Sequence, residues 1–493
     1  MSQGKRMRTE DTATSKKGRK DNKALDTFFK LIAFAYVVIT IIFYIAILKL
    51  NLLPGWVITI FTIAEIVFTL AMVIGLVKRH KTYKLTIISL IIILFVSGIY
   101  IYVTNYALAT ISFLGDVLQE TKETDEYYLI VRKDSSYAKI EDIENKNIHF
   151  FQVADDVKSE LTKKVRVTLV NQENLLDLGN KLIDKNVDVI LTSATQYSML
   201  GDEIKNFRES TKILYTIKHE IQTSTKTAEK GSKYSVKSGK FNVYISGIDT
   251  SGSISNVARS DANILMTVNT NTHEALLTSI PRDYYVTLHS YGAKDKLTHS
   301  GIYGINETVK TVEDLLDTDI NYYVRVNFTT VIKLVDKLGG VDVYSDYSFT
   351  TSDKLYTFKK GYNHMNGEEA LRFSRERYSF ASGDNQRVKN QQHVIEAIMK
   401  KVLNSTTLLT KYTDILDSLK GSFQTNIAQD DISSLVKDQI NNMSSWTIKS
   451  NSLTGTGASS STYSMGSTKL YVMVPNSTSV TSAKEKIDEV LGE

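Results

Sequence analysis

The pattern of hydrophobic and polar positions divides the chain into an apolar N-terminal part and two soluble parts. Three nearly uninterrupted apolar runs come first, at residues 28–48, 52–77 and 85–104. Each is close to the roughly 20 residues that a helix needs to cross a bilayer. We therefore expect three transmembrane helices within 28–105, preceded by a polar, basic tail at residues 1–27.

The basic residues around these runs predict their orientation. The tail is rich in lysine and arginine, the connection at 49–51 has only Lys49, and the connection at 78–84 is again basic. Because positively charged connections stay in the cytoplasm, the tail and the second connection should face the cytoplasm. Everything after residue 105 should then be extracellular, on a multi-pass protein of the cell membrane.

The first soluble part, residues 107–222, alternates strand-like and helix-like patterns. The strand-like runs are 127–132, 148–152, 165–170, 187–191 and 212–217, and the helix-like ones are 157–164, 173–185 and 194–200. This alternation predicts a small α/β domain. It has no glycine-rich phosphate loop and no tight group of polar residues, so we expect a structural or accessory role.

A polar linker at 223–240 leads to the second soluble part, 241–493, which is also α/β in pattern. Strands are expected at 241–248, 264–268, 275–279, 322–327, 341–345 and 470–474, and helices at 305–316, 329–338, 408–419, 430–442 and after Pro475. The Ser/Gly/Thr-rich segment 450–468 is expected to be a loop. The helix 329–338 could line an apolar tunnel, but ordinary core packing explains its apolar residues at least as well.

Charged residues stand at three strand ends of this second part. Asp249 follows the strand 241–248, Asp261 precedes the strand 264–268, and Arg282 follows the strand 275–279. Strand ends are where open α/β sheets bind ligands. Two carboxylates suit Mg²⁺ that also contacts a phosphate, although a turn at Asp249 and a surface ion pair at Arg282 are the plain alternatives.

Residues 372–391 carry the most informative spacing in the chain. Arg375 and Arg377 are two apart, which points both to one side only on an extended segment. Arg387 and Gln391 are four apart, which places them on one face of a helix. We expect a short strand and a helix start that bring three guanidinium groups and one amide together.

Planar guanidinium groups near a helix N-terminus suit the oxygens of a phosphate. The alternative is a solvated basic strip that forms ion pairs with Glu376 and Asp384. Composition narrows the chemistry further: the net charge of +5 gives no general case for nucleic acid, and the absence of cysteine excludes disulfides, cysteine–zinc sites and a thiol nucleophile.

Seven ordered motifs in residues 240–400 resemble those of the LytR-CpsA-Psr family. They are Gly247-Ile248-Asp249, Arg259-Ser260-Asp261, Ile280-Pro281-Arg282-Asp283, Lys296-Leu297-Thr298-His299, Gly367-Glu368-Glu369-Ala370-Leu371, Arg375-Glu376-Arg377 and Gly383-Asp384 with Arg387 and Gln391-Gln392. The anchor and the part at 107–222 resemble the capsular or exopolysaccharide members of streptococcal type. The resemblance implies an α/β/α domain with a central mixed sheet.

The resemblance also implies a function. Such proteins transfer a glycopolymer from a polyprenyl pyrophosphate carrier to peptidoglycan as a phosphodiester, outside the cell, alongside other capsule assembly proteins. Asp249 and Asp261 would then hold Mg²⁺, and Asp261 is a candidate for assisting deprotonation. Five residues would bind the pyrophosphate, of which the first three would also be catalytic: Arg282, Arg375, Arg377, Arg387 and Gln391. Many relatives have arginine where this chain has Asn390.

The main alternative is a membrane-bound transcriptional regulator of capsule or exopolysaccharide expression. Its DNA contacts would have to come from residues 1–27 or 78–84, which are too short for a helix-turn-helix. We therefore expect no specific nucleic-acid partner. A binding module that holds polymer without chemistry is a further alternative.

Overall fold

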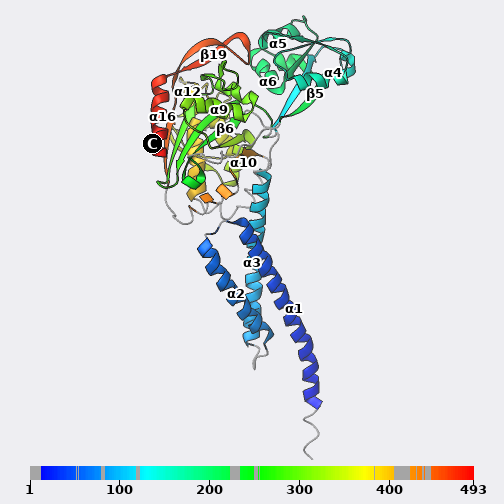
Figure 1. Ribbon diagram of the computed structural model, residues 1–493, viewed down its shortest axis with the longest axis vertical. Coiled ribbons are helices and arrows are strands. Elements are labelled where there is room, and N and C mark those ends of the chain that lie inside the picture. The colour runs from blue at the N-terminus through cyan, green and yellow to red at the C-terminus, as the bar shows by residue number, and fades with distance from the viewer. Residues whose placement is uncertain are drawn as a thin grey trace, which may run out of the picture. The chain divides into compact units, whose positions relative to one another are not determined.

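The computed structural model describes most of the chain as two compact units. The described residues are 13–51, 53, 55–78, 84–117, 123–221, 234–248, 254, 256–381, 383–404, 422–428, 430–432, 434–435, 438 and 446–493. The first unit comprises Met1–Leu114 with Ser433–Asn441, and the second comprises Gly115–Ile432 with Asn442–Glu493. Figure 1 labels some of the elements of both units.

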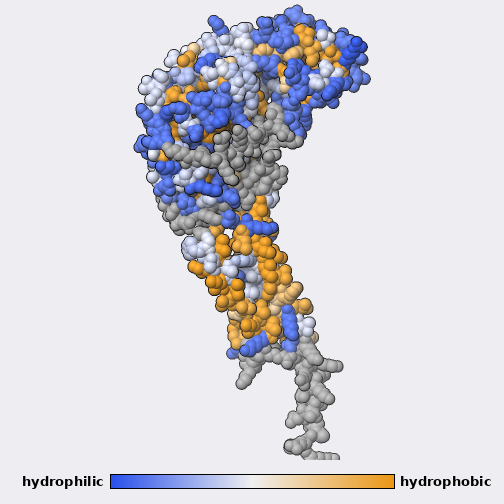
Figure 2. All heavy atoms as spheres, in the orientation of Figure 1, coloured by the Kyte–Doolittle hydropathy of each residue, from blue (hydrophilic) through white to orange (hydrophobic). Residues whose placement is uncertain are grey.

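The first unit contains three long apolar helices, α1 (Ala13–Leu50), α2 (Gly55–Val77) and α3 (Lys84–Val117). Their segments Ala24–Leu50, Gly55–Val77 and Lys84–Ser112 are long and apolar enough to cross a membrane, as the sequence predicts. Large apolar side chains such as Phe34 and Phe95 point outward, being 69% and 70% exposed. Figure 2 shows the resulting hydrophobic surface along the helices, which suits contact with lipid.

A carboxyl group lies between these helices. The Glu65 side chain on α2 is only 8% exposed. It accepts hydrogen bonds from the Tyr100 hydroxyl on α3, at 2.5 Å, and from the Thr69 hydroxyl, at 3.1 Å. A polar group in the bilayer needs such partners, so Glu65 joins α2 to α3.

The second unit begins with an α/β accessory domain. Its strands are β1 (Glu123–Arg132), β2 (Asn147–Phe150), β3 (Thr168–Asn171), β4 (Val189–Ser193) and β5 (Thr211–Ile221), and its helices are η1 (Ile140–Ile143), α4 (Asp155–Lys164), α5 (Leu175–Ile183), α6 (Ala194–Glu203) and α7 (Phe207–Ser210). The sheet has the order β3-β2-β4-β1-β5. β2 runs parallel to β3 and β4, whereas β1 is antiparallel to β4 and β5.

Alternation along these strands builds a core on each face of the sheet. Leu129 and Leu191 belong to one buried cluster, whereas Ile130 and Ile190 belong to another. Successive residues of a strand point to opposite faces, so both faces are covered. The second cluster also contains Met465 and Leu470, which lie near the end of the chain and tie the accessory domain to the C-terminal region.

The larger domain is built on a six-stranded mixed sheet. In the order of the sheet, its strands are β16 (Phe423–Thr425), β11 (Tyr322–Asn327), β6 (Lys240–Ile248), β7 (Ser260–Asn269), β8 (Glu274–Ile280) and β17 (Thr447–Ser452). The pairs β6–β11 and β8–β17 are parallel and the others antiparallel. This is the central mixed sheet that the sequence resemblance implies.

Helices cover both faces of this sheet. The helices α9 (Ile305–Leu316) and α16 (Ser477–Leu491) share a buried cluster with Tyr244, Leu265 and Leu276 of the strands. The helices α10 (Phe328–Lys337) and α12 (Asp384–Asn404) pack against β11, β8 and β17. The smaller elements are η2 (Val236–Ser238), β9 (Tyr285–Thr287), β10 (Lys294–Lys296), α8 (Leu297–Ser300), η3 (Gly301–Tyr303), β12 (Val341–Ser345), β13 (Phe349–Thr350), β14 (Thr357–Phe358), β15 (Gly361–Met365) and α11 (Gly367–Arg375).

The expected loop at 450–468 is wrong. The segment completes β17 and forms β18 (Gly455–Thr462), which pairs in antiparallel register with β19 (Gly466–Pro475). The two strands form a hairpin, and β19 contributes the buried side chains of Leu470 and Val472. The expected helix at 408–419 lies outside the described residues, as does much of the one at 430–442.

Candidate functional site

One cavity of about 700 Å³ gathers the predicted site residues that the structure describes. Asp261, Arg282, Arg375, Arg377, Arg387 and Gln391 all line it. Asp249 lies outside the described residues. The same cavity is lined by further residues that the sequence analysis did not assign to a site, namely Met199, Gly201, Asp202, Glu203, Arg259, Asp283, Lys296, Thr298, His299, Tyr378, Met465, Leu470 and Tyr471.

Cationic groups outnumber carboxylates around this cavity. Among the described lining residues are six arginine or lysine side chains and four aspartate or glutamate side chains. A concave site lined by an excess of one charge attracts ligands of the opposite charge. The cavity therefore suits a polyanion, as the spacing of the arginines predicts.

Asp261 at the start of β7 is the best-defined carboxylate of the cavity. Its Oδ1 accepts hydrogen bonds from Arg282 Nη1, at 3.1 Å, and from the Thr298 hydroxyl, at 2.9 Å. Burial alone would raise the pKa of Asp261, but Arg282, Arg259, Arg387 and the Thr298 hydroxyl outweigh burial and lower this pKa to about 2. Asp261 is thus ionised and is a weak base.

Lys296 and Asp283 form a second ion pair beside the first. The Lys296 Nζ lies 3.1 Å from Asp283 Oδ1, and Arg282 Nε lies 3.6 Å from Asp283 Oδ2. All three side chains are mostly buried. Lys296 belongs to one of the seven motifs, Lys296-Leu297-Thr298-His299, and this membership is the sequence signal that could have assigned it to the site.

The expected strand at Arg375 and Arg377 is wrong, because Arg375 is the last residue of helix α11. The helix begins with a capping box, in which Asn366 Oδ1 accepts the Glu369 N–H and Glu369 Oε2 accepts the Asn366 N–H, both at 2.9 Å. This pattern is a known helix start. Arg377 lies beyond the helix, and both arginines still line the same cavity.

Glu376 stabilises the turn between Arg375, which is helical, and Arg377, which lies beyond the helix. Its side chain is buried, and Oε1 accepts the backbone N–H groups of residues 377–379 at 3.1, 2.8 and 3.0 Å. Oε2 accepts the N–H and hydroxyl of Ser352, at 2.7 and 3.1 Å. The carboxylate stabilises the turn after α11. The alternative of a solvated basic strip gives Glu376 a different role, that of an ion-pair partner for the arginines.

Arg387 and Gln391 lie on helix α12 and face the cavity, as their spacing predicts. The next residue, Gln392, fixes this helix to the sheet, because its Nε2 donates to the Asn451 carbonyl at 2.6 Å. Asn390 points elsewhere: it is 1% exposed, and its Nδ2 donates to the Phe373 carbonyl of α11 at 3.2 Å. It connects α12 to α11 and is not among the residues that line the cavity.

The donor chemistry of Asp261 fits Mg²⁺. An ionised carboxylate is the kind of ligand that this ion prefers. Strand β6 ends at Ile248, whose partner on β7 is Ser260, so the end of β6 that precedes Asp249 adjoins the residue before Asp261. Within the described residues, no group of three or more His, Asp or Glu side chains is placed to hold a metal ion.

Comparison with known proteins identifies the family. The model of the LytR_cpsA_psr family matches residues 204–486, which is more than half of the chain. The chain belongs to this family. The matched region contains each of the seven motifs and begins after helix α6, so the membrane helices and most of the accessory domain lie outside it.

Relatives within the LytR_cpsA_psr family are named as transferases. The chain is 37% identical over 206 residues to the polyisoprenyl-teichoic acid–peptidoglycan teichoic acid transferase TagU of Bacillus cereus, covering 42% of this chain and 66% of the relative. It is 32% identical over 252 residues to TagU of Enterococcus faecalis, covering 50% and 81%. The crystal structure of Bacillus subtilis TagU is 31% identical with a TM-score of 0.40, covering 52% of this chain and 97% of that one.

Proposed function

We propose that this protein transfers a glycopolymer from a polyprenyl pyrophosphate carrier to peptidoglycan. The observation that carries the proposal is the single cavity into which Arg282, Arg375, Arg377, Arg387 and Gln391 converge beside Asp261. Three of these arginines come from separate parts of the fold: Arg282 follows β8, Arg375 ends α11, and Arg387 lies on α12. The names of the TagU relatives, which act on polyisoprenyl-teichoic acid and peptidoglycan, support the same reaction class.

The arginines would bind the pyrophosphate of the carrier. Guanidinium groups bind phosphate oxygens in a bidentate manner and keep their charge at any physiological pH. An acceptor hydroxyl on peptidoglycan would attack the phosphorus that carries the sugar, and the bond from that phosphorus to the bridging oxygen would break. Polyprenyl phosphate would leave with the bridging oxygen and take up the proton of the acceptor hydroxyl, and the polymer would be joined to peptidoglycan by a phosphodiester. No covalent intermediate with the protein is needed.

Asp261 would act in this reaction as a ligand for Mg²⁺, together with Asp249. When bound, the ion would neutralise charge on the phosphate oxygens. The lowered pKa of Asp261 favours this role over that of a base, because a carboxylate that binds protons weakly takes few of them from a hydroxyl. Arg282 and Thr298 would hold the Asp261 carboxylate in place through their hydrogen bonds.

The polymer that we propose is a capsular polysaccharide or exopolysaccharide. Support comes from the three apolar helices and the accessory domain, which resemble the streptococcal-type members that carry these polymers. The apolar helices and the basic segments at 1–27 and 78–84 support a membrane protein with a cytoplasmic N-terminus and an extracellular catalytic domain.

The test is a reconstituted transfer reaction. The full-length chain in detergent would be incubated with Mg²⁺, polyprenyl-pyrophosphate-linked glycan and peptidoglycan, and the muramidase digest would be analysed by mass spectrometry. We expect glycan-bearing muropeptides joined through a phosphodiester. Intact carrier-linked glycan after incubation, with no modified muropeptide, would refute the transferase and leave the binding module or the regulator of expression as alternatives.

A further inference from the structure

The accessory domain contributes an acidic residue to the cavity and pairs it with an arginine of the larger domain. The Asp202 Oδ2, at the end of α6, lies 2.9 Å from Arg259 Nη1. Both residues line the 700 Å³ cavity. The Arg259 side chain is only 13% exposed, and its positive charge contributes to the lowered pKa of Asp261. An accessory residue is thereby connected to the centre of the candidate site.

The second carboxylate oxygen of Asp202 is bound by Arg208 of the accessory domain. The Arg208 Nη2 donates to Asp202 Oδ1 at 3.1 Å and to the Ser198 carbonyl at 3.1 Å. Arg208 passes so close to Gly201 that a Cβ atom there would lie 2.4 Å from its Nε. Glycine is therefore required at position 201 for this arrangement. The carboxylate of Asp202 lies between two guanidinium groups and gives Arg259 a held partner.

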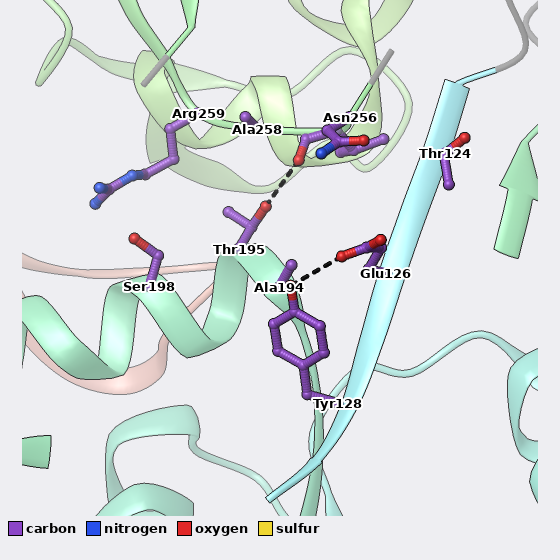
Figure 3. A pocket seen from close by; sticks show the side chains of 10 residues that line it. Thr124, Glu126, Tyr128, Ala194, Thr195, Ser198, Asn256, Ala258 and Arg259 are labelled. Carbon is purple, nitrogen blue, oxygen red and sulfur yellow. Dashed lines mark hydrogen bonds between the residues drawn. The ribbon is translucent and has the colours of Figure 1, made fainter. Parts of the chain in front are cut away.

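The accessory domain is also packed firmly at this place. The Thr195 hydroxyl on α6 donates to the Val257 carbonyl at 3.2 Å. Figure 3 shows this contact beside a smaller cavity of 210 Å³, with Arg259 extending on the side of α6 that carries Ser198. Further away, the Asn174 Nδ2 donates to the hydroxyl of Thr468 on the β18–β19 hairpin at 2.8 Å. The Thr195 contact is on the same helix as Asp202 and keeps that helix against the larger domain, whereas the Asn174 contact is separate from it.

We propose that the accessory domain is part of the anion site, and that Asp202 is a positioning residue that holds Arg259 in place for the pyrophosphate. This inference rests on the proposed function. By its charge alone, a carboxylate at the wall of an anion site weakens anion binding. Asp202 can increase the affinity for an anion only if it holds the guanidinium group of Arg259 in the binding conformation beforehand, so that less side-chain entropy is lost when the ligand binds.

The two effects of Asp202 have opposite signs, which makes the inference testable. The full-length chain in detergent with Mg²⁺ would be titrated with inorganic pyrophosphate by calorimetry. Asp202→Asn keeps the shape of the side chain and removes its charge. If Asp202 positions Arg259, the variant should bind pyrophosphate roughly tenfold more weakly, as expected for the loss of one charge-assisted contact. If Asp202 acts only through its charge, the variant should bind more tightly.

Two control variants separate positioning from charge and from stability. Glu203→Gln removes the same charge from the neighbouring residue of the same cavity and should bind pyrophosphate at least as tightly as the wild type. Asn174→Ala removes hydrogen bonds from the accessory domain to Ser467 and Thr468 of the hairpin, none of which lines the cavity, so it should lower the thermal midpoint and leave the affinity unchanged. A third variant, Gly201→Ala, displaces Arg208 and should weaken binding in the same direction as Asp202→Asn.

Three results would contradict the positioning role of Asp202. Binding by Asp202→Asn that equals or exceeds that of the wild type overturns the positioning role while leaving the proposed function intact. A loss of affinity in Asn174→Ala as large as that in Asp202→Asn overturns it too, because loosening of the domain contact would then explain both. A wild-type chain that does not bind pyrophosphate overturns the proposed function and this inference together.

Discussion

The buried carboxylate of Glu376 is expected to control both the stability of the turn after α11 and the activity of the two arginines beside it. The perturbation is Glu376→Gln, which keeps the size of the side chain and removes its charge. Glutamine has one acceptor oxygen where glutamate has two, and its amide nitrogen must face hydrogen-bond donors. Either the N–H groups of residues 377–379 or the two donors of Ser352 then lose their acceptor.

The magnitude can be worked out from these contacts. A hydrogen bond to a charged group contributes about 1.5–3 kcal/mol to stability. The bonds to one oxygen of Glu376 share that acceptor, so their contributions do not add in full. Losing the set on one oxygen should cost about 3 kcal/mol in the free energy of unfolding. For a domain of this size, that corresponds to a fall of roughly 6–12 °C in the thermal midpoint. Transfer activity should fall as well, because Arg375 and Arg377 flank the turn.

The effect should also depend on pH. Burial would raise the pKa of Glu376, but the N–H and hydroxyl donors of Ser352, Ser379 and Tyr378 outweigh burial and lower it. A lowered pKa means that the stabilisation is fully present above the unfolded-state pKa of about 4.3 and is lost as the pH falls through the folded-state pKa. The difference in midpoint between wild type and Glu376→Gln should therefore shrink on acidification below about pH 4.

The assay is thermal unfolding of the full-length chain followed by the transfer reaction. The matched control is Glu368→Gln in the first turn of α11, where the carboxylate forms a half-exposed ion pair with Arg372 at 2.8 Å. An exposed pair of this kind contributes under about 1 kcal/mol, so the control should keep its midpoint and activity. If Glu376→Gln behaves like this control, the proposed role of Glu376 in the turn is refuted.

Three further predictions concern the charge of the site and the membrane. Arg375→Ala and Arg377→Lys should each lower the transfer rate by roughly 10²–10³-fold with little change in midpoint, since an ammonium does not reproduce the planar fork of a guanidinium; full activity in both would contradict the pyrophosphate site. Asp249→Ala and Asp261→Ala should each abolish Mg²⁺-dependent transfer, and a normal dependence of the rate on Mg²⁺ in both would move the metal site elsewhere. Protease added to intact cells should cleave residues after 105 and spare an N-terminal tag, whereas the reverse pattern would invert the topology.

Elements that depend on periodicity could be predicted from the sequence, whereas one local capping signal and the elements that depend on tertiary neighbours were missed. The three apolar helices and the face shared by Arg387 and Gln391 arise from local spacing, and the structure confirms them. The strand at Arg375 and Arg377 was wrong because the spacing argument ignored the helix start at Asn366 and Glu369. Asn366 and Glu369 have the three-residue spacing of a capping box, which is a local signal for a helix that begins there.

Other errors could not be corrected from the sequence. β18 consists almost entirely of Gly, Ser and Thr, which are typical of a loop, and it is a strand because β19 pairs with it. Strand formation depends strongly on such tertiary partners. In the same way, no local pattern connects Asp202 with Arg259, since the pair is formed only when the accessory domain packs against the larger one.

The packing of the β18–β19 hairpin has a consequence for how the chain folds during synthesis. Met465 and Leu470 complete the core of the accessory domain beside Met199 and Leu200. At roughly 5–20 residues per second, the ribosome needs about 15–50 seconds to make the intervening chain. During that time the nascent accessory domain exposes an apolar surface where the hairpin will later pack. The accessory domain is made before the larger domain but is completed after most of it, and this interval is when a holding chaperone has the most apolar surface to bind.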